Sequence, residues 1–346
     1  MYGTLLQVPV IGMEFEAFAV LLIAALAGGA FGAALGALPS FVFTGFVVFL
    51  GEGLGVLEGD LATDITGVIG FGAVTGPHIA FAGGVAATAY AGRKYPEMAP
   101  DGSTYHFGKE IAYAFGTKPD ILAVGAVFGA LGMLITQVMT GLGFPTDNIA
   151  LSVVATAFLA RIAFGYPLVG KVGGSSVLDM SPFERGEKRI AADGGTETGR
   201  LATEPWLPHQ YEWSGVTAIG IVGGLLGGFI WLETGSIFMG YAISAMSLLF
   251  LNLGVEKIPV THHITLLGST GAVIAASAVS SDPIVLLVAG AFGAISALIG
   301  ELSQRVFYSH SGTHVDPPAM AIAAFMLVIG VLYLAGLLPN PGYLGL

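Results

Sequence analysis

Hydrophobic residues fill most of the chain in long runs, which polar residues interrupt at only a few places. An apolar helix needs about 20 residues to cross the hydrocarbon core of a bilayer, and ten runs approach that length. They lie at about 16–38, 40–57, 65–92, 119–142, 148–166, 214–233, 236–254, 257–280, 283–307 and 317–338. None of them alternates between apolar and polar residues as a barrel strand does. The pattern therefore predicts an all-α membrane protein with about ten transmembrane helices.

Two polar loops, 93–118 and 167–213, interrupt the apolar runs. With ten spans, both loops lie on the same face of the membrane, together with Lys257 and Arg305. All twelve Lys and Arg residues then lie on or close to that face. Because basic residues are retained on the cytoplasmic side, we expect a multi-pass protein of the cell membrane with cytoplasmic loops and both termini outside.

Composition supports the membrane class and excludes several functions. Hydrophobic residues make up 54% of the chain and charged residues only 10%, against about 25% charged residues in soluble proteins. The net charge of −11 argues against a nucleic-acid partner. The chain has no cysteine, which excludes disulfides and thiolate chemistry. The first 16 residues hold no Lys or Arg, so we expect no secretory signal there.

Short segments of the first half recur in the same order in the second half. The pairs are 26–32 with 221–227, 77–84 with 262–269, 124–138 with 288–302, and 146–155 with 315–324. Each half holds five predicted spans, and an odd number of spans inverts the second copy in the bilayer. We therefore predict a first five-helix repeat at 1–166, a cytoplasmic linker loop at 167–213 and a second, inverted repeat at 214–346.

The segment TGPHIAFAGG (75–84) predicts a broken helix in the third span, and VTHHITLLGS (260–269) is its counterpart in the eighth span. In inverted-repeat transporters, interrupted helices near the midplane form the substrate site. The residues expected to line such a path are Gly76, Pro77, His78, Gly83, His262, His263 and Gly268. The alternative is a simple proline kink, with each histidine bonded to a carbonyl of a neighbouring helix.

Four acidic residues are candidates for a gate or an ion ligand: Glu52, Asp147, Glu301 and Asp316. Asp147 and Asp316 begin the fifth and tenth spans, where a carboxylate also serves as an N-cap. Glu301 stands four residues before Arg305, so an ion pair is an alternative use. His310, His314 and Asp316 are secondary candidates for a metal site. We expect no bound cofactor and no catalytic residue.

The first span and the stretch GALPSFVFTGFVVFLGEG (36–53) resemble a largely haloarchaeal family of Gly/Ala-rich multi-pass membrane proteins. The resemblance implies a membrane-embedded helical fold and assigns no activity or site residue. In layout alone, the predicted inverted repeat with paired histidines is similar to ammonium and urea channels, although the chain carries no signature of either.

The sequence therefore predicts a transporter or channel for a small solute or ion, passive or ion-coupled, rather than an enzyme. Its glycine-rich helix faces suggest close packing and homo-oligomers within the lipid bilayer. The first alternative is a membrane-embedded metal-binding protein or metalloenzyme that uses His262, His263, His310, His314 and Asp316. The second alternative is a structural membrane subunit that docks a partner through the 167–213 loop.

Overall fold

The computed structural model describes residues 7–58, 64–190 and 197–346. The chain is almost entirely helical. Within the described residues, the only sheet is a short antiparallel hairpin of β1 (Lys188–Ile190) and β2 (Glu197–Leu201) in the linker loop. The predicted all-α class is therefore confirmed.

Five helical segments form the first half of the chain. They are α1 (Phe15–Leu35), α2 (Ala37–Glu58), α3 (Ala82–Lys94) with the π-helical turn η2 (Pro77–Phe81) directly before it, α4 (Pro119–Gly141) and α5 (Asn148–Ala163). A second π-helical turn, η1 (Thr66–Gly70), precedes η2, and two short 3₁₀ turns, η3 (Pro96–Met98) and η4 (Phe107–Lys109), lie in the loop after α3.

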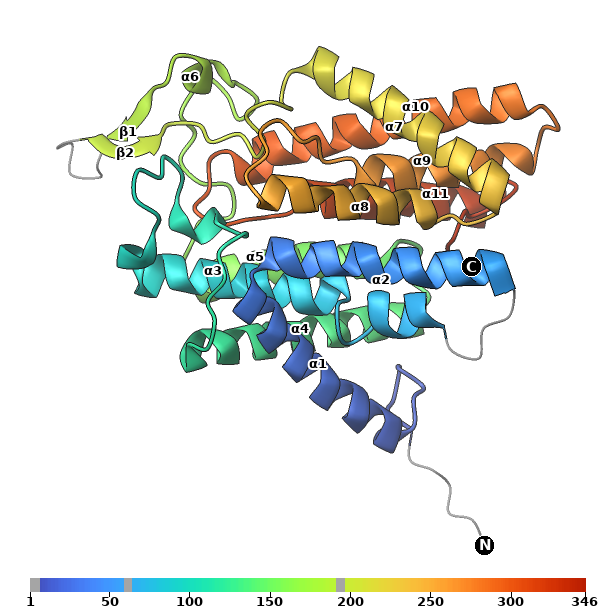
Figure 1. Ribbon diagram of the computed structural model, residues 1–346, viewed down its shortest axis with the longest axis horizontal. Coiled ribbons are helices and arrows are strands. Elements are labelled where there is room, and N and C mark those ends of the chain that lie inside the picture. The colour runs from blue at the N-terminus through green and yellow to red at the C-terminus, as the bar shows by residue number, and fades with distance from the viewer. Residues whose placement is uncertain (1–6, 59–63, 191–196) are drawn as a thin grey trace, which may run out of the picture.

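Five more helical segments follow the linker loop, which also holds the single turn α6 (Ser181–Glu184). They are α7 (Trp213–Thr234), α8 (Met239–Asn252), α9 (His262–Ala276), α10 (Asp282–Ser303) with the π-helical turn η5 (Gln304–Tyr308) after it, and α11 (Pro317–Leu334). In Figure 1 the first half lies below and the second half above, with α2 and α8 at the border between them.

Among the described residues, six helices are long and apolar enough to cross a membrane: α1, α2, α4, α7, α10 with η5, and α11. The ten predicted spans are therefore not confirmed. Helices α5 and α8 are apolar but shorter. The run at 65–92 is broken, and the run at 257–280 holds a helix shorter than predicted. The first breaks at Gly76–Pro77, as predicted, because proline has no N–H to continue the preceding turn. The second run becomes helical only at His262, after Pro259 and the left-handed residue Lys257 (φ 62°).

Glycines allow the helices of each half to pack backbone to backbone. Helix α1 packs against α3 and α4, and α7 packs against α9 and α10. A Cβ atom on Gly29 would overlap the backbone of Gly125 and Gly129 on α4. A Cβ atom on Gly224 of α7 would likewise overlap Gly293 on α10. Small residues permit this close approach, which lets dispersion contacts hold the helices together in lipid.

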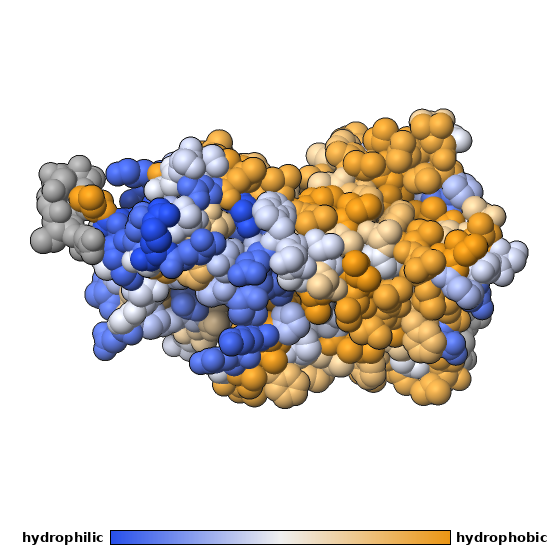
Figure 2. Space-filling view, turned by 90° about the horizontal axis from the view of Figure 1, so that it is seen from above, coloured by the Kyte–Doolittle hydropathy of each residue, from blue (hydrophilic) through white to orange (hydrophobic). Residues whose placement is uncertain are grey.

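The two polar loops meet at one end of the molecule. The Leu201 amide donates to the Thr104 carbonyl at 2.9 Å, and the Tyr105 hydroxyl donates to the Pro205 carbonyl at 2.7 Å. Figure 2 shows hydrophilic residues gathered at this end, whereas hydrophobic residues cover most of the rest of that face. We call this end, formed by loops 95–118 and 164–212, the polar cap.

Candidate functional site

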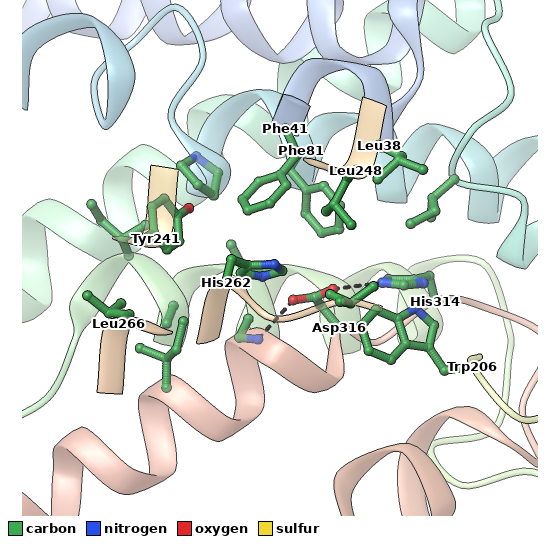
Figure 3. A pocket seen from close by; sticks show the side chains of 18 of the residues that line it. Leu38, Phe41, Phe81, Trp206, Tyr241, Leu248, His262, Leu266, His314 and Asp316 are labelled. Atoms are coloured by element: carbon green, nitrogen blue, oxygen red, sulfur yellow. Dashed lines mark hydrogen bonds and ion pairs between the residues drawn. The ribbon is translucent and has the colours of Figure 1, made fainter. Parts of the chain in front are cut away.

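A cavity of about 820 Å³ lies between the two halves of the chain. Segments of the first half contribute Phe41, Phe81 and Asp147 to its wall, and segments of the second half contribute His262 and Asp316. Several of these side chains face one another across the space in Figure 3. Cavities that bind small organic molecules span roughly 300–1,000 Å³, so this one has room for more than a bare ion.

The wall of the cavity reaches exposed positions at two opposite ends of the molecule. Residues 102–104 of the polar cap line one end and are exposed. Thr140, near the far end of α4, and Gly345, near the C-terminus, are exposed lining residues at the other end. The lining residues therefore connect the cap to the opposite end of the helices.

Aromatic rings form much of the wall near its centre. The Phe41 ring packs against the rings of Phe81 and Tyr241, with centroids 5.9 and 6.0 Å apart in edge-to-face geometry. The Phe71 ring lies 5.7 Å from Tyr241 and 5.1 Å from Phe238. Such pairs add to the burial energy of each ring and hold the rings in defined orientations. The wall is therefore mainly apolar and preformed.

Asp316 and His314 form a bonded pair in this wall, on the loop that leads into α11. One Asp316 oxygen, Oδ2, accepts a hydrogen bond from the Ala319 amide at 2.8 Å, which is the predicted N-cap. The other oxygen, Oδ1, lies 3.1 Å from Nε2 of His314. Because a carboxylate can only accept, Nε2 carries a proton, and in the neutral ring Nδ1 of His314 presents a lone pair.

Two histidine nitrogens in the wall are buried without a hydrogen-bond partner among the described residues. They are Nδ1 of His314, which is 0% exposed, and Nδ1 of His262, which is 6% exposed. His262 is the first residue of α9, and the centroid of its ring lies 4.7 Å from that of the Phe41 ring. Buried polar atoms normally have a partner, since leaving one unpaired is costly. These two atoms are therefore the places where a bound solute or water would form hydrogen bonds.

Asp147 is an N-cap as well as a lining residue. Its Oδ1 accepts from the Ala150 amide at 2.8 Å at the start of α5, and its Oδ2 accepts from the Tyr343 hydroxyl at 2.8 Å. Both predicted aspartates therefore cap a helix and border the cavity, and the two proposed uses are compatible.

The predicted path residues divide into two groups. Pro77 and His262 line the large cavity, whereas the lining does not include Gly76, His78, Gly83, His263 or Gly268. His78 and His263 are both buried, and the His263 ring borders a separate void of about 10 Å³. Gly83 and Gly268 are helix contacts, because a Cβ atom on either would overlap the backbone of α1 or α7. The structure therefore does not bring His78 and His263 together around the cavity.

The other two acidic candidates bond to neighbouring side chains away from the cavity. Glu301 forms an ion pair with Nε of Arg305 at 2.5 Å, which is the alternative use that its spacing indicated. Glu52 accepts a hydrogen bond from the Thr66 hydroxyl at 2.8 Å and another from the Ser236 hydroxyl. Glu52 therefore joins α2 to the α7–α8 connection of the second half.

The secondary metal candidates do not converge. His310 bonds through Nε2 to the Val177 carbonyl at 3.0 Å, while His314 bonds to Asp316. Among the described residues, no three His, Asp or Glu side chains come together in a way that could hold a metal ion.

A buried ion network lies at the cap end of the cavity, and the sequence alone did not indicate it. Nζ of Lys109 lies 2.7 Å from Oε2 of Glu204, and both side chains are buried. Arg200 reaches the other oxygen of Glu204 at 2.7 Å. The Lys109 ammonium also lies 4.3 Å from the centre of the Tyr308 ring. Lys109 lines the cavity, so the network links its wall to both polar loops.

The pKa values of this network reflect its burial and its charges. Burial lowers the pKa of Lys109 to about 7, although the neighbouring Glu204 carboxylate acts in the opposite direction. Burial alone would raise the pKa of Glu204, but the charges of Lys109 and Arg200 together lower it. Glu204 is therefore ionised at neutral pH, and Lys109 is the group of the network that titrates there.

Lys109 should make stability depend on pH. The pKa of Lys109 falls from 10.5 to about 7 in the folded chain, so between these values the unfolded chain binds more protons. Stability rises with pH wherever the unfolded state holds more protons. Relative to Lys109→Met, the free energy of unfolding of the unmodified protein should rise across this window, by at most about 1.4 kcal/mol per pH unit. Denaturant unfolding in detergent at several pH values measures the difference, and a falling difference would contradict the assignment.

The fold and its apolar surface are those of a helical membrane protein. The described residues form an all-helical fold with six membrane-length apolar helices. Apolar side chains of these helices are exposed on the outside, such as Leu287 at 70% and Leu226 at 54%. Such a surface is typical of membrane proteins. The chain belongs to DUF7973, a family of unknown function, whose sequence profile matches residues 10–346. No curated protein and no solved structure matches the chain.

Proposed function

We propose that the protein is an integral membrane transporter or channel, and that a small solute passes through the cavity between the two halves. The observation that carries the proposal is the course of the cavity wall, which runs from exposed residues of the polar cap to exposed residues at the opposite end. A subunit that only docks a partner needs no such space. On the charge distribution of the loops, the polar cap is cytoplasmic and both termini are outside.

We further propose that the two halves are inverted repeats of five helical segments each. The order of helix contacts supports this, because α1 with α3 and α4 corresponds to α7 with α9 and α10. Between the halves, each partner is the equivalent helix: α2 packs against α8, and α5 packs against α11. A two-fold axis within the membrane plane relates such elements in many transporters.

Contacts of the aligned histidines support the same relation. The carbonyl of His78 lies against Gly132, where a Cβ atom would overlap it. The carbonyl of the aligned His263 accepts a hydrogen bond from the Ser296 hydroxyl at 3.1 Å, and position 296 aligns with position 132. The paired histidines thus have equivalent backbone environments in the two halves. Their sequence match reflects the repeat, while His262 and His314 are the histidines at the cavity.

Cysteine labelling tests whether the cavity is a water-filled path. The chain has no cysteine of its own, so in each single-cysteine variant the introduced thiol is the one that reacts with the reagent. Ile322 lines the cavity and is 6% exposed, whereas Val328, one and a half turns further along α11, is 51% exposed on the outside. In proteoliposomes, Ile322→Cys should react with the cationic reagent 2-(trimethylammonio)ethyl methanethiosulfonate. Val328→Cys should not, because a thiol facing hydrocarbon does not ionise.

Flux through the same variants separates a path from a closed pocket. Light scattering should show that proteoliposomes take up at least one of urea, glycine and tetramethylammonium chloride faster than protein-free liposomes. Labelling should abolish that uptake in Ile322→Cys and leave it unchanged in Val328→Cys. If Ile322→Cys is as unreactive as Val328→Cys, or labelling it leaves flux intact, the cavity is not the path.

A further inference from the structure

The cavity wall holds more acidic than basic residues. Three acidic residues line it, namely Glu110, Asp147 and Asp316, distributed from the cap end to the far end. The basic residue of the lining, Lys109, is already paired with Glu204. The Asp147 and Asp316 carboxylates cap helices, which keeps them in place beside the cavity. A cation entering the cavity would therefore meet fixed negative charge along its length.

The rings of the wall suit the same kind of solute. Aromatic residues of both halves and of the linker loop line the cavity: Phe41, Phe71, Phe81, Tyr105, Trp206, Phe238, Tyr241, Tyr308 and Tyr343. The face of an aromatic ring attracts a cation, and the attraction grows where water is excluded. The Lys109 ammonium already uses the face of Tyr308 in this way, at 4.3 Å. A solute with an apolar body and a positive charge could bury its body while the rings and carboxylates stabilise its charge.

The unpartnered Nδ1 atom of His314 also favours a solute that donates a hydrogen bond over one that accepts it. Its Nε2 proton is committed to Asp316, so the free Nδ1 atom is a hydrogen-bond acceptor. This atom is fully buried, on a ring held between Phe81 and Tyr308, with centroids 5.7 and 5.4 Å away. A bound anion would need donors at this position, whereas a protonated amine or a polarised C–H group beside a positive nitrogen supplies a partner.

We propose that the cavity binds monovalent organic cations with an aromatic or aliphatic body, of the ammonium or pyridinium class, with the charge held near Asp316, His314 and the Phe41–Phe81 rings. This assignment rests on the proposed function, since it names the solute class of the same cavity. The volume of about 820 Å³ fits such a solute better than a bare metal ion.

Equilibrium binding to the purified full-length protein in detergent tests the assignment without requiring transport. The probes are N-methyl-4-phenylpyridinium, neutral 4-phenylpyridine and the anion biphenyl-4-sulfonate, which share a two-ring body and differ in charge. By isothermal titration calorimetry at pH 7.5, the cation should bind about ten times more tightly than the neutral probe, and the anion more weakly than either.

Two substitutions locate the site of binding. Asp316→Asn keeps a residue that caps helices well, so the fold is retained while the charge is lost. It should weaken binding of the cation about tenfold and leave 4-phenylpyridine unchanged. Asp282→Asn is the matched control, because Asp282 begins α10 but is exposed and outside the cavity. That variant should bind all three probes as the unmodified protein does.

The possible results separate the solute class from the path. Tighter binding of the anion or the neutral probe overturns the cationic class, and so does the absence of cation binding. If flux through Ile322→Cys still responds to labelling, the path stands even when the cationic class fails. Equal loss of cation binding in Asp316→Asn and Asp282→Asn would also overturn the proposed site, because it would indicate a surface effect of charge.

Discussion

Replacing Arg161 with methionine is expected to lower the free energy of unfolding by about 3–5 kcal/mol. The Arg161 guanidinium is fully buried and donates to the carbonyls of Leu168, Phe307 and Thr313, the last at 3.0 Å. Its Nε also donates to the Thr313 hydroxyl at 2.7 Å. Methionine fills similar space but donates nothing, so the partly buried carbonyls of Leu168 and Phe307 and the buried carbonyl of Thr313 lose a donor. Each buried group left unsatisfied costs about 1–3 kcal/mol.

The position of Arg161 explains how a buried cation is tolerated without a carboxylate beside it. Arg161 lies in the last turn of α5, and Phe307 lies in the last turn of η5. The carbonyl ends of helices carry partial negative charge, which stabilises a nearby cation. The same bonds tie α5 of the first half to the loop that carries His314 and Asp316. Losing them should therefore also loosen the cavity wall.

Thermal unfolding of the purified protein in detergent measures the effect. Arg161→Lys should be intermediate, because an ammonium keeps the charge but cannot reach all four acceptors. Arg93→Met is the matched control, since Arg93 also donates to two carbonyls, those of Phe164 and Gly165, but is exposed. That change should cost less than about 1 kcal/mol. Equal losses for Arg161→Met and Arg93→Met would show that burial of the network is not what matters.

Replacing Glu204 with glutamine should also lower the free energy of unfolding by about 3–5 kcal/mol. Glu204 lies at 0% exposure between Lys109 and Arg200. Its removal leaves the buried Lys109 without a counter-charge, so Lys109 either gives up its proton or stays as an uncompensated charge, and breaking a buried pair in this way is costly. The change also disconnects the loop before α4 from the linker loop at the cap end of the cavity.

A double-mutant cycle separates the lost charge from lost packing. Adding Lys109→Met to Glu204→Gln removes the unpaired, buried Lys109 amine, so the double variant should recover at least about 1 kcal/mol relative to Glu204→Gln alone. Glu187→Gln is the control, because its ion pair with Arg185 is exposed, at 57% and 44% for the two side chains. That change should cost less than about 1 kcal/mol. Strictly additive losses for Lys109→Met and Glu204→Gln would rule out charge compensation.

What the sequence by itself determined was local. Apolar runs identified the helical class, because each run must bury its backbone polar groups within itself in lipid. Gly76–Pro77 marked a helix break, since proline has no N–H to donate to a carbonyl of the preceding turn. Asp147 and Asp316 were identified as N-caps from their places before the fifth and tenth runs, and both accept a bond from the amide three residues on. Run length did not show where those runs stop being helical, and six membrane-length helices are found among the described residues.

Only the tertiary structure decided which side chains share the cavity. Aligned histidines suggested His78 and His263, but their neighbours in space are close-packed helices of their own halves. His314, which was not predicted as a path residue, lines the cavity together with His262. Lys109 and Glu204 are far apart in the chain, as are Arg161 and Thr313, and no spacing rule relates them. Helix periodicity acts over a few residues, whereas these contacts depend on how whole helices and loops pack. The sequence therefore specified the segments, and their packing specified the site.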